Sequence, residues 1–144
     1  VFYITTRINV FSDLIFERVL PAEVYDFLKK IDEEQYSRIR EASSEISSFL
    51  IVVFSICFVG PVSEEFFFRG IILKYMVLAS GNLYGSVITS LLFAFVHSNL
   101  VHIPALFFMG IFMSFLVIKS RSIYPSILIH ILHNSIALVI LNSK

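Results

Sequence analysis

Glu64, Glu65 and Arg69 lie between two strongly apolar stretches, residues 49–62 with no charge and residues 71–80 with a single lysine. Ionised groups in such surroundings cost free energy unless they are paired or used, and they are typical of functional sites. On a helix, Glu65 and Arg69 share a face and can pair. Glu64 is rotated by about 100° and should face another neighbour, free for chemistry. The alternative is that all three groups cap a helix at a membrane surface.

Two later apolar segments also contain polar residues, His97 in the first and His130 with Asn134 in the second. His130 and Asn134 are four residues apart and would share one helix face. A carboxylate such as Glu64, held where the dielectric is low, can take a proton from water and act as a general base. Histidine and asparagine can donate hydrogen bonds to an oxygen that gains negative charge. Together these residues suit hydrolysis of an amide by an activated water.

A metal site is the second chemical interpretation. Glu64, His97 and His130 could supply three ligands to Zn²⁺ and leave the fourth position to water. No His-Glu-x-x-His element supports this hypothesis, and the sequence does not decide between the two. We interpret the remaining histidines, His102 and His133, as interfacial or packing residues.

The composition indicates a membrane protein. Of the 144 residues, 57% are hydrophobic and 15% are charged, against roughly 45–50% and ~25% in soluble domains. The formal net charge is zero, which argues against a nucleic-acid partner. Cys57 is the only cysteine, so an internal disulfide is excluded, and we expect a small buried apolar side chain there.

These elements predict an all-α fold, a polytopic transmembrane helix bundle that follows an N-terminal amphipathic region. Residues 1–45 form that juxtamembrane region, with an amphipathic helix or helical hairpin over residues 22–44 on the membrane surface. Residues 46–141 form the membrane domain. Its expected helices cover residues 46–62, 64–80, 83–98, 103–118 and 123–141.

Two local signals set the expected helix boundaries. Pro61 marks an end or a kink, and Gly81 lies in a stop and turn. If every apolar run crosses the membrane, the basic residues before the first span and those before the last lie on the same side, which is then cytoplasmic. The first residue is Val rather than Met, so we expect a fragment that lacks earlier membrane segments.

Three motifs in this order resemble the CAAX-protease and bacteriocin-processing family of intramembrane proteases, also called the Abi family. The family patterns are Glu-Glu-x-x-x-Arg, Phe-x-x-x-His and His-x-x-x-Asn or Asp. In this sequence they are Glu64 to Arg69, Phe93 to His97, and His130 to Asn134. The resemblance covers residues 46–141.

The resemblance implies a role for each motif residue. Glu64 would activate the water, and His97 would help to position it. His130 and Asn134 would bind the carbonyl oxygen as it becomes an oxyanion, while Glu65 and Arg69 would support the site. The resemblance leaves both a metal-free glutamate mechanism and a metallopeptidase open.

It also implies an integral, multi-pass protein of the cell membrane, in contact with lipid. Its substrate would be a membrane-associated protein or peptide, either prenylated at a Cys-aliphatic-aliphatic-X box or similar to a bacteriocin. The alternative function is a non-catalytic bacteriocin-immunity, scaffold or binding protein. A small ion or proton pathway is a third hypothesis, because ionisable groups inside helices also mark such routes.

Overall fold

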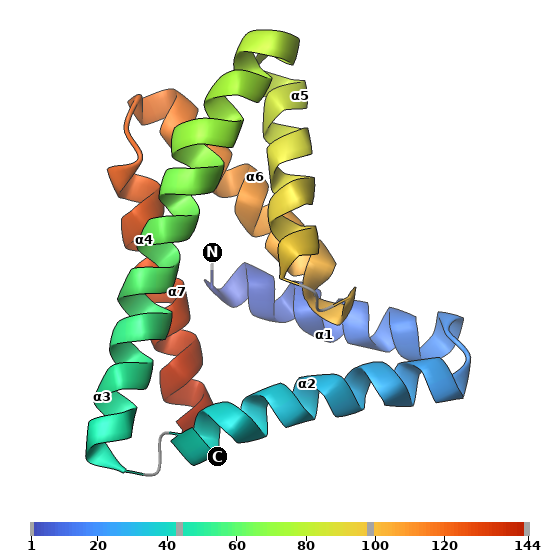
Figure 1. Ribbon diagram of the computed structural model, residues 1–144. Coiled ribbons are helices and arrows are strands. Elements are labelled where there is room, and N and C mark those ends of the chain that lie inside the picture. Colours follow the sequence, from blue (N-terminus) through green and yellow to red (C-terminus); the bar gives the residue numbers. More distant parts are fainter. Residues whose placement is uncertain (1, 43–44, 98–99, 143–144) are drawn as a thin grey trace.

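The computed structural model describes residues 2–42, 45–97 and 100–142. Within these ranges the chain is helical apart from short connections and contains no strand, which confirms the predicted all-α fold (Figure 1). The elements in chain order are α1 (Phe2–Val19), α2 (Ala22–Ala42), α3 (Ile46–Phe54), the π-helical turn η1 (Ser55–Val59), α4 (Gly60–Glu65), the π-helical turn η2 (Phe66–Ile72), α5 (Leu73–Val96), the 3-10 turn η3 (Leu100–His102), α6 (Ile103–Ser120) and α7 (Tyr124–Asn142).

The N-terminal region is a helical hairpin made of α1 and α2. Asp13 of α1 accepts hydrogen bonds from Lys29 at 2.6 Å and from the Tyr25 hydroxyl at 3.2 Å. α1 packs against α6 and η3. The turn between α1 and α2 projects to one side, and α2 runs past the lower end of the bundle (Figure 1). Residues 22–42 therefore form one helix of the hairpin, and α1 is the other.

The expected break between residues 46–62 and 64–80 is absent. α3, η1, α4 and η2 follow one another without interruption and continue into α5, so that one helix leads to Ser80. Pro61 is tolerated inside this helix because η1 widens the turn before it, and Gly60 donates its N–H to Ser55, five residues back. The prediction of two separate spans here was wrong.

The chain reverses at Gly81, as predicted. Its φ of 80° and ψ of 172° are non-helical and divide α5 into a rising and a descending arm. Glycine adopts a positive φ without the steric penalty that other residues incur.

The merged helix changes the predicted sidedness of the basic residues. α3 and α4 rise, the second arm of α5 descends, α6 rises and α7 descends (Figure 1). The α6–α7 connection, next to Lys119 and Arg121, therefore lies at the end of the bundle opposite to α2. The prediction that these residues and the basic residues of α2 share one side was wrong, because it counted one crossing too many.

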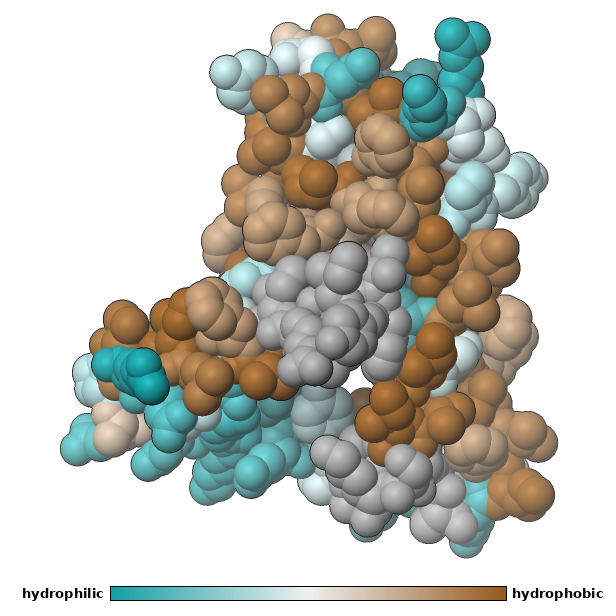
Figure 2. All heavy atoms as spheres, turned by 180° about the vertical axis from the view of Figure 1, so that it is seen from behind, coloured by the Kyte–Doolittle hydropathy of each residue, from teal (hydrophilic) through white to brown (hydrophobic). Residues whose placement is uncertain are grey.

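Two segments are long and apolar enough to cross a membrane, Ile46–Val96 with its reversal and Ile103–Ser120. Their most apolar windows are only 11% and 28% buried, so these side chains are exposed to a degree that the core helix of a soluble protein would not tolerate. Figure 2 shows hydrophobic side chains over the bundle and α1, and hydrophilic side chains gathered along α2. This distribution agrees with a bundle in lipid and with α2 at its surface.

A small hydrophobic core lies where η2, α5 and α6 meet, next to the candidate site. It consists of Phe68, Phe93, Met109 and Met113. Ile72, Leu106 and Ile129 pack against this core from its edges. Cys57, as predicted, is buried, with 1% of its surface exposed.

Candidate active site

The predicted pair between Glu65 and Arg69 is confirmed. Arg69 Nη1 donates to Glu65 Oε1 at 2.8 Å, and both side chains are fully buried. The other end of the guanidinium, Nη2, lies 3.5 Å from the main-chain oxygen of Gly110 in α6. The arginine therefore neutralises Glu65 and connects η2 with α6, which makes this carboxylate a poor candidate for a base.

His130 in α7 joins the same pair. Its Nδ1 lies 3.1 Å from Glu65 Oε1, the oxygen that also accepts from Arg69. Because a carboxylate paired with arginine is an acceptor only, His130 Nδ1 must carry the proton. His130 is 2% exposed, so Glu65 fixes the orientation of a buried imidazole.

Phe93 lies at the centre of these groups. The guanidinium of Arg69 lies 4.3 Å from the centroid of the Phe93 ring. The rings of His97 and His130 lie 4.6 Å and 5.8 Å from it. Phe93 is completely buried and belongs to the apolar core, so this ring joins the core to the three polar side chains by contacts that favour the arginine and the imidazoles.

Glu64 faces the two histidines, as expected for a carboxylate on a different helix face from Glu65. Its Oε2 lies 3.4 Å from His97 Nε2 and 3.7 Å from His130 Nε2. This oxygen is buried, and no hydrogen bond within the described part of the protein satisfies it. The side chains of Glu64 and His97 are 34% and 28% exposed, so this side of the site, unlike Glu65, is open to an incoming molecule.

Both imidazoles present the same nitrogen to Glu64. His97 Nδ1 lies 2.7 Å from the main-chain oxygen of Phe93, four residues earlier, and must donate to it. Since Nδ1 of His130 is likewise engaged, each ring turns Nε2 toward the Glu64 carboxylate. That nitrogen accepts a hydrogen bond when the ring is neutral and donates one when it is protonated.

Asn134 is placed differently from the other predicted residues. Its Nδ2 donates at 2.9 Å to the main-chain oxygen of Ile56 in η1. Asn134 thus faces the same long helix as His130, but it contacts main chain before Pro61 rather than the Glu64 carboxylate.

The fit of a metal ion can be judged from the donors present. Glu64, His97 and His130, the ligands that the sequence suggested, lie near one another. Across residues 2–42, 45–97 and 100–142, however, no group of three or more His, Cys, Asp or Glu side chains is arranged to hold a metal ion. A zinc centre therefore stays a hypothesis.

Two further features lie apart from these residues. His102 Nε2 lies 3.4 Å from Asp32 Oδ1 and 3.3 Å from the Tyr36 hydroxyl, which connects η3 to α2.

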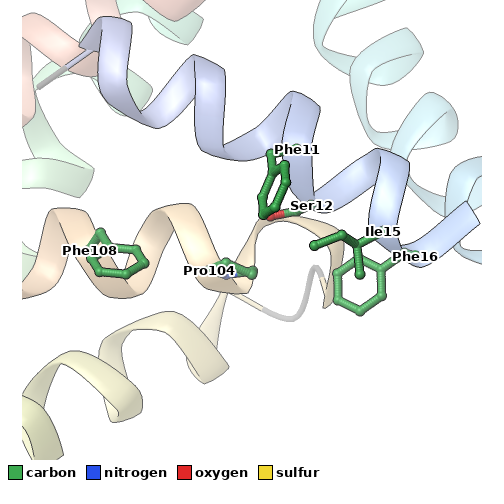
Figure 3. A pocket seen from close by; sticks show the side chains of 6 residues that line it. All are labelled: Phe11, Ser12, Ile15, Phe16, Pro104 and Phe108. Carbon is green, nitrogen blue, oxygen red and sulfur yellow. The ribbon is translucent and has the colours of Figure 1, made fainter. Parts of the chain in front are cut away.

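An apolar groove with a volume of about 410 Å³ opens between α1 and α6 (Figure 3). Its lining residues are Phe11, Ser12, Ile15, Phe16, Pro104 and Phe108.

Sequence reasoning missed two main-chain acceptors, the carbonyl groups of Ile56 and Gly110. A main-chain oxygen leaves no trace in residue type. For Ile56 an indirect signal exists, because Pro61 follows five residues later and lacks the N–H that a π-helical turn would use. For Gly110 the sequence offers no such signal, because the reason for a glycine there, a Cβ that would lie 2.9 Å from the Cβ of Ser90, is visible only in the packed helices.

Fold and site together define a class of protein. The apolar helix bundle buries a neutralised carboxylate and holds a second carboxylate near two imidazoles, a combination of groups that suits proton transfer. Residues 46–136 match the family model described as type II CAAX prenyl endopeptidase Rce1-like. The chain belongs to this family of membrane proteases. No curated protein and no solved structure matches it.

Proposed function

We propose that this protein is an intramembrane endopeptidase in which Glu64 activates the attacking water. The observation that supports this proposal most directly is the contrast between the two adjacent carboxylates. Glu65 is neutralised by Arg69. Glu64 has an unsatisfied buried oxygen within 3.4 Å and 3.7 Å of two imidazole nitrogens. A water that donates to this oxygen would lie between groups able to take up and return a proton.

The proposed reaction starts with that water. Glu64 takes one proton from it, and the hydroxide attacks the carbonyl carbon of the scissile peptide bond. His97 Nε2 helps to orient the water, while protonated His130 donates from Nε2 to the carbonyl oxygen as it becomes an oxyanion. Glu64 then returns the proton to the leaving amide nitrogen, the C–N bond breaks, and one water has been added across it.

The surrounding groups support this chemistry by charge and position. Glu65, held by Arg69, accepts a hydrogen bond from His130 Nδ1 and so keeps this ring oriented with Nε2 toward Glu64. The Phe93 carbonyl does the same for Nδ1 of His97. The resemblance also implies an oxyanion contact from Asn134, whose amide already donates to Ile56.

The proposed substrate is a membrane-associated, prenylated protein or peptide that ends in a Cys-aliphatic-aliphatic-X box. The name of the matching family supports this choice. So do the exposed apolar side chains of the bundle, because a lipid attached to the substrate can stay in the bilayer while the peptide reaches Glu64. We propose accordingly that the protein is integral to the membrane and crosses it several times.

The experiment compares Glu64→Gln with the wild-type protein in liposomes, on a farnesylated fluorogenic peptide with the Cys-aliphatic-aliphatic-X ending. Glutamine keeps the size of the side chain but cannot accept the proton, so we expect a loss of rate of about 10²-fold or more. Glu41→Gln, an exposed change on α2, is the matched control and should cleave at the wild-type rate. Wild-type cleavage by a well-folded Glu64→Gln protein would remove Glu64 from the mechanism.

A further inference from the structure

The π-helical turn before Pro61 leaves one main-chain oxygen without its helical partner. Gly60 donates its N–H to Ser55, five residues back, and so it no longer serves the oxygen of Ile56. In this register the next N–H, from residue 61, would reach Ile56. Proline has no N–H, and the oxygen of Ile56 is therefore not satisfied by its own helix.

The side chain of Asn134 replaces the missing donor. Its Nδ2 lies 2.9 Å from the Ile56 oxygen, across 78 positions of sequence. In an apolar segment an unsatisfied carbonyl is costly, because lipid cannot replace the lost hydrogen bond. This contact therefore favours the π-helical register and attaches α7 to it.

The same register determines where Glu64 points. Gly60–Glu65 forms only six residues of α-helix between η1 and η2. A return of η1 to α-helical register would rotate the following residues by about 100°, the angle that separates consecutive side chains. Glu64 would then turn away from His97 and His130.

We propose that Asn134 is a positioning residue: its amide supplies the hydrogen bond that Pro61 cannot make, and it thereby holds Glu64 toward the two histidines. This inference rests on the proposed function for its effect on cleavage, but not for its effect on structure. It differs from the oxyanion role, in which Asn134 would donate to the substrate.

A suppressor experiment separates the two roles. The variants are Asn134→Ala, Pro61→Ala and the double variant. Alanine at position 61 restores a main-chain N–H that can reach the Ile56 oxygen, so the asparagine should become dispensable. This restored main-chain N–H cannot replace a side chain that donates a hydrogen bond to the substrate oxyanion. The neighbouring Ser135→Ala, which removes only a hydrogen bond to Ile131 within α7, is the matched control.

Cys57 provides a readout that is independent of cleavage. It is the only cysteine of the chain, lies within η1 and is 1% exposed. Its rate of labelling by a maleimide in detergent micelles therefore reports how often this turn opens. Cleavage of the farnesylated peptide is measured on the same preparations.

We expect Cys57 of the Asn134→Ala variant to react about tenfold faster or more than Cys57 of the wild type, because an orphaned buried carbonyl destabilises the turn. We also expect this variant to lose most of its cleavage activity. The Pro61→Ala variant and the double variant should have Cys57 labelling rates, and also peptide cleavage rates, within about threefold of each other. Ser135→Ala should behave as the wild type. If Asn134→Ala does not accumulate in the membrane, accumulation of the double variant supports the inference and its failure to accumulate contradicts it.

Three results would overturn the inference. One is wild-type labelling of Cys57 in Asn134→Ala. Another is loss of cleavage in Pro61→Ala alone, because the register would then depend on the proline itself. The third is a double variant with restored labelling but no cleavage, the result expected of an oxyanion donor. If the wild type does not cleave the peptide, the proposed function fails, whereas restored labelling in the double variant still supports the structural role of Asn134.

Discussion

His130 Nδ1 and Arg69 Nη1 share one acceptor, the Oε1 atom of Glu65, at 3.1 Å and 2.8 Å. Through this oxygen the long helix that contains α4 and η2 is attached to α7, while Arg69 also approaches the Gly110 carbonyl of α6. The charges compensate one another where the surrounding side chains exclude water. The arrangement places a structural ion pair directly behind the proposed reacting groups.

Arg69→Met should therefore destabilise the protein strongly, because it leaves the Glu65 carboxylate buried without its cation. Breaking a buried pair in this way costs about 3–5 kcal/mol. The measurement is denaturant unfolding in detergent micelles. Lys74→Met, five residues later and exposed, is the control and should change stability by no more than about 0.5 kcal/mol. Equal effects of the two changes would show that the buried pair contributes little.

Gly110→Ala tests the close approach of α5 and α6. A Cβ at this position would lie 2.9 Å from the Cβ of Ser90, so the helices must separate, at a cost of about 1–3 kcal/mol. The shift should also move the Gly110 carbonyl away from Arg69. Thermal unfolding measures the loss of stability. Adding Ser90→Gly to the Gly110→Ala protein should recover most of this lost stability.

The control for this prediction is a second glycine with room for a methyl group. A Cβ on Gly70 would meet its nearest atom at 3.9 Å, an ordinary contact. Gly70→Ala should leave stability unchanged or raise it by up to ~1 kcal/mol through helix propensity. A Gly110→Ala protein as stable as Gly70→Ala would mean that the two helices can move apart freely.

Removal of divalent cations tests the cofactor hypothesis. The proposed mechanism uses protein groups alone, so cleavage of the farnesylated peptide should survive dialysis against a strong chelator. Metal analysis of the purified protein should accompany the assay. Loss of cleavage that added Zn²⁺ restores would instead support the zinc site at Glu64, His97 and His130.

The Lys29–Asp13 contact of the α1–α2 hairpin should hold through the neutral range and weaken in strong alkali. Burial lowers the pKa of Lys29, but the hydrogen bond and charge of Asp13 outweigh it, and the net pKa lies above the ordinary 10.5. A raised lysine pKa stabilises the contact below pH 10.5, and this contribution is lost as the pH rises through the folded value.

Spin labels on Glu17→Cys and Asp26→Cys, exposed positions of the two helices, would report the hairpin by their distance. Asp13→Asn should widen the distance distribution already at neutral pH. Unchanged distances in that variant would show that the Lys29–Asp13 contact is not needed for the hairpin.

Periodicity and residue type were sufficient for much of this protein. The four-residue spacing predicted the Glu65–Arg69 pair, and the rotation of about 100° between neighbours on a helix predicted that Glu64 faces other groups. Gly81 was identified as the reversal, because its residue type tolerates a positive φ. Apolar runs predicted the helices, since burial and lipid contact both require a hydrophobic surface.

Register and partner choice needed the tertiary structure. Pro61 was expected to mark an end or a kink, and the structure excludes the end: the helix continues because a widened turn precedes the proline and a side chain 78 positions away supplies a donor to Ile56. The false break reversed the predicted side of Lys119 and Arg121. Sequence alone named the side chains able to do chemistry, because that ability belongs to each residue. Which of them meet was decided by packing between helices, since a hydrogen bond across the bundle depends on the path of every helix between its two ends.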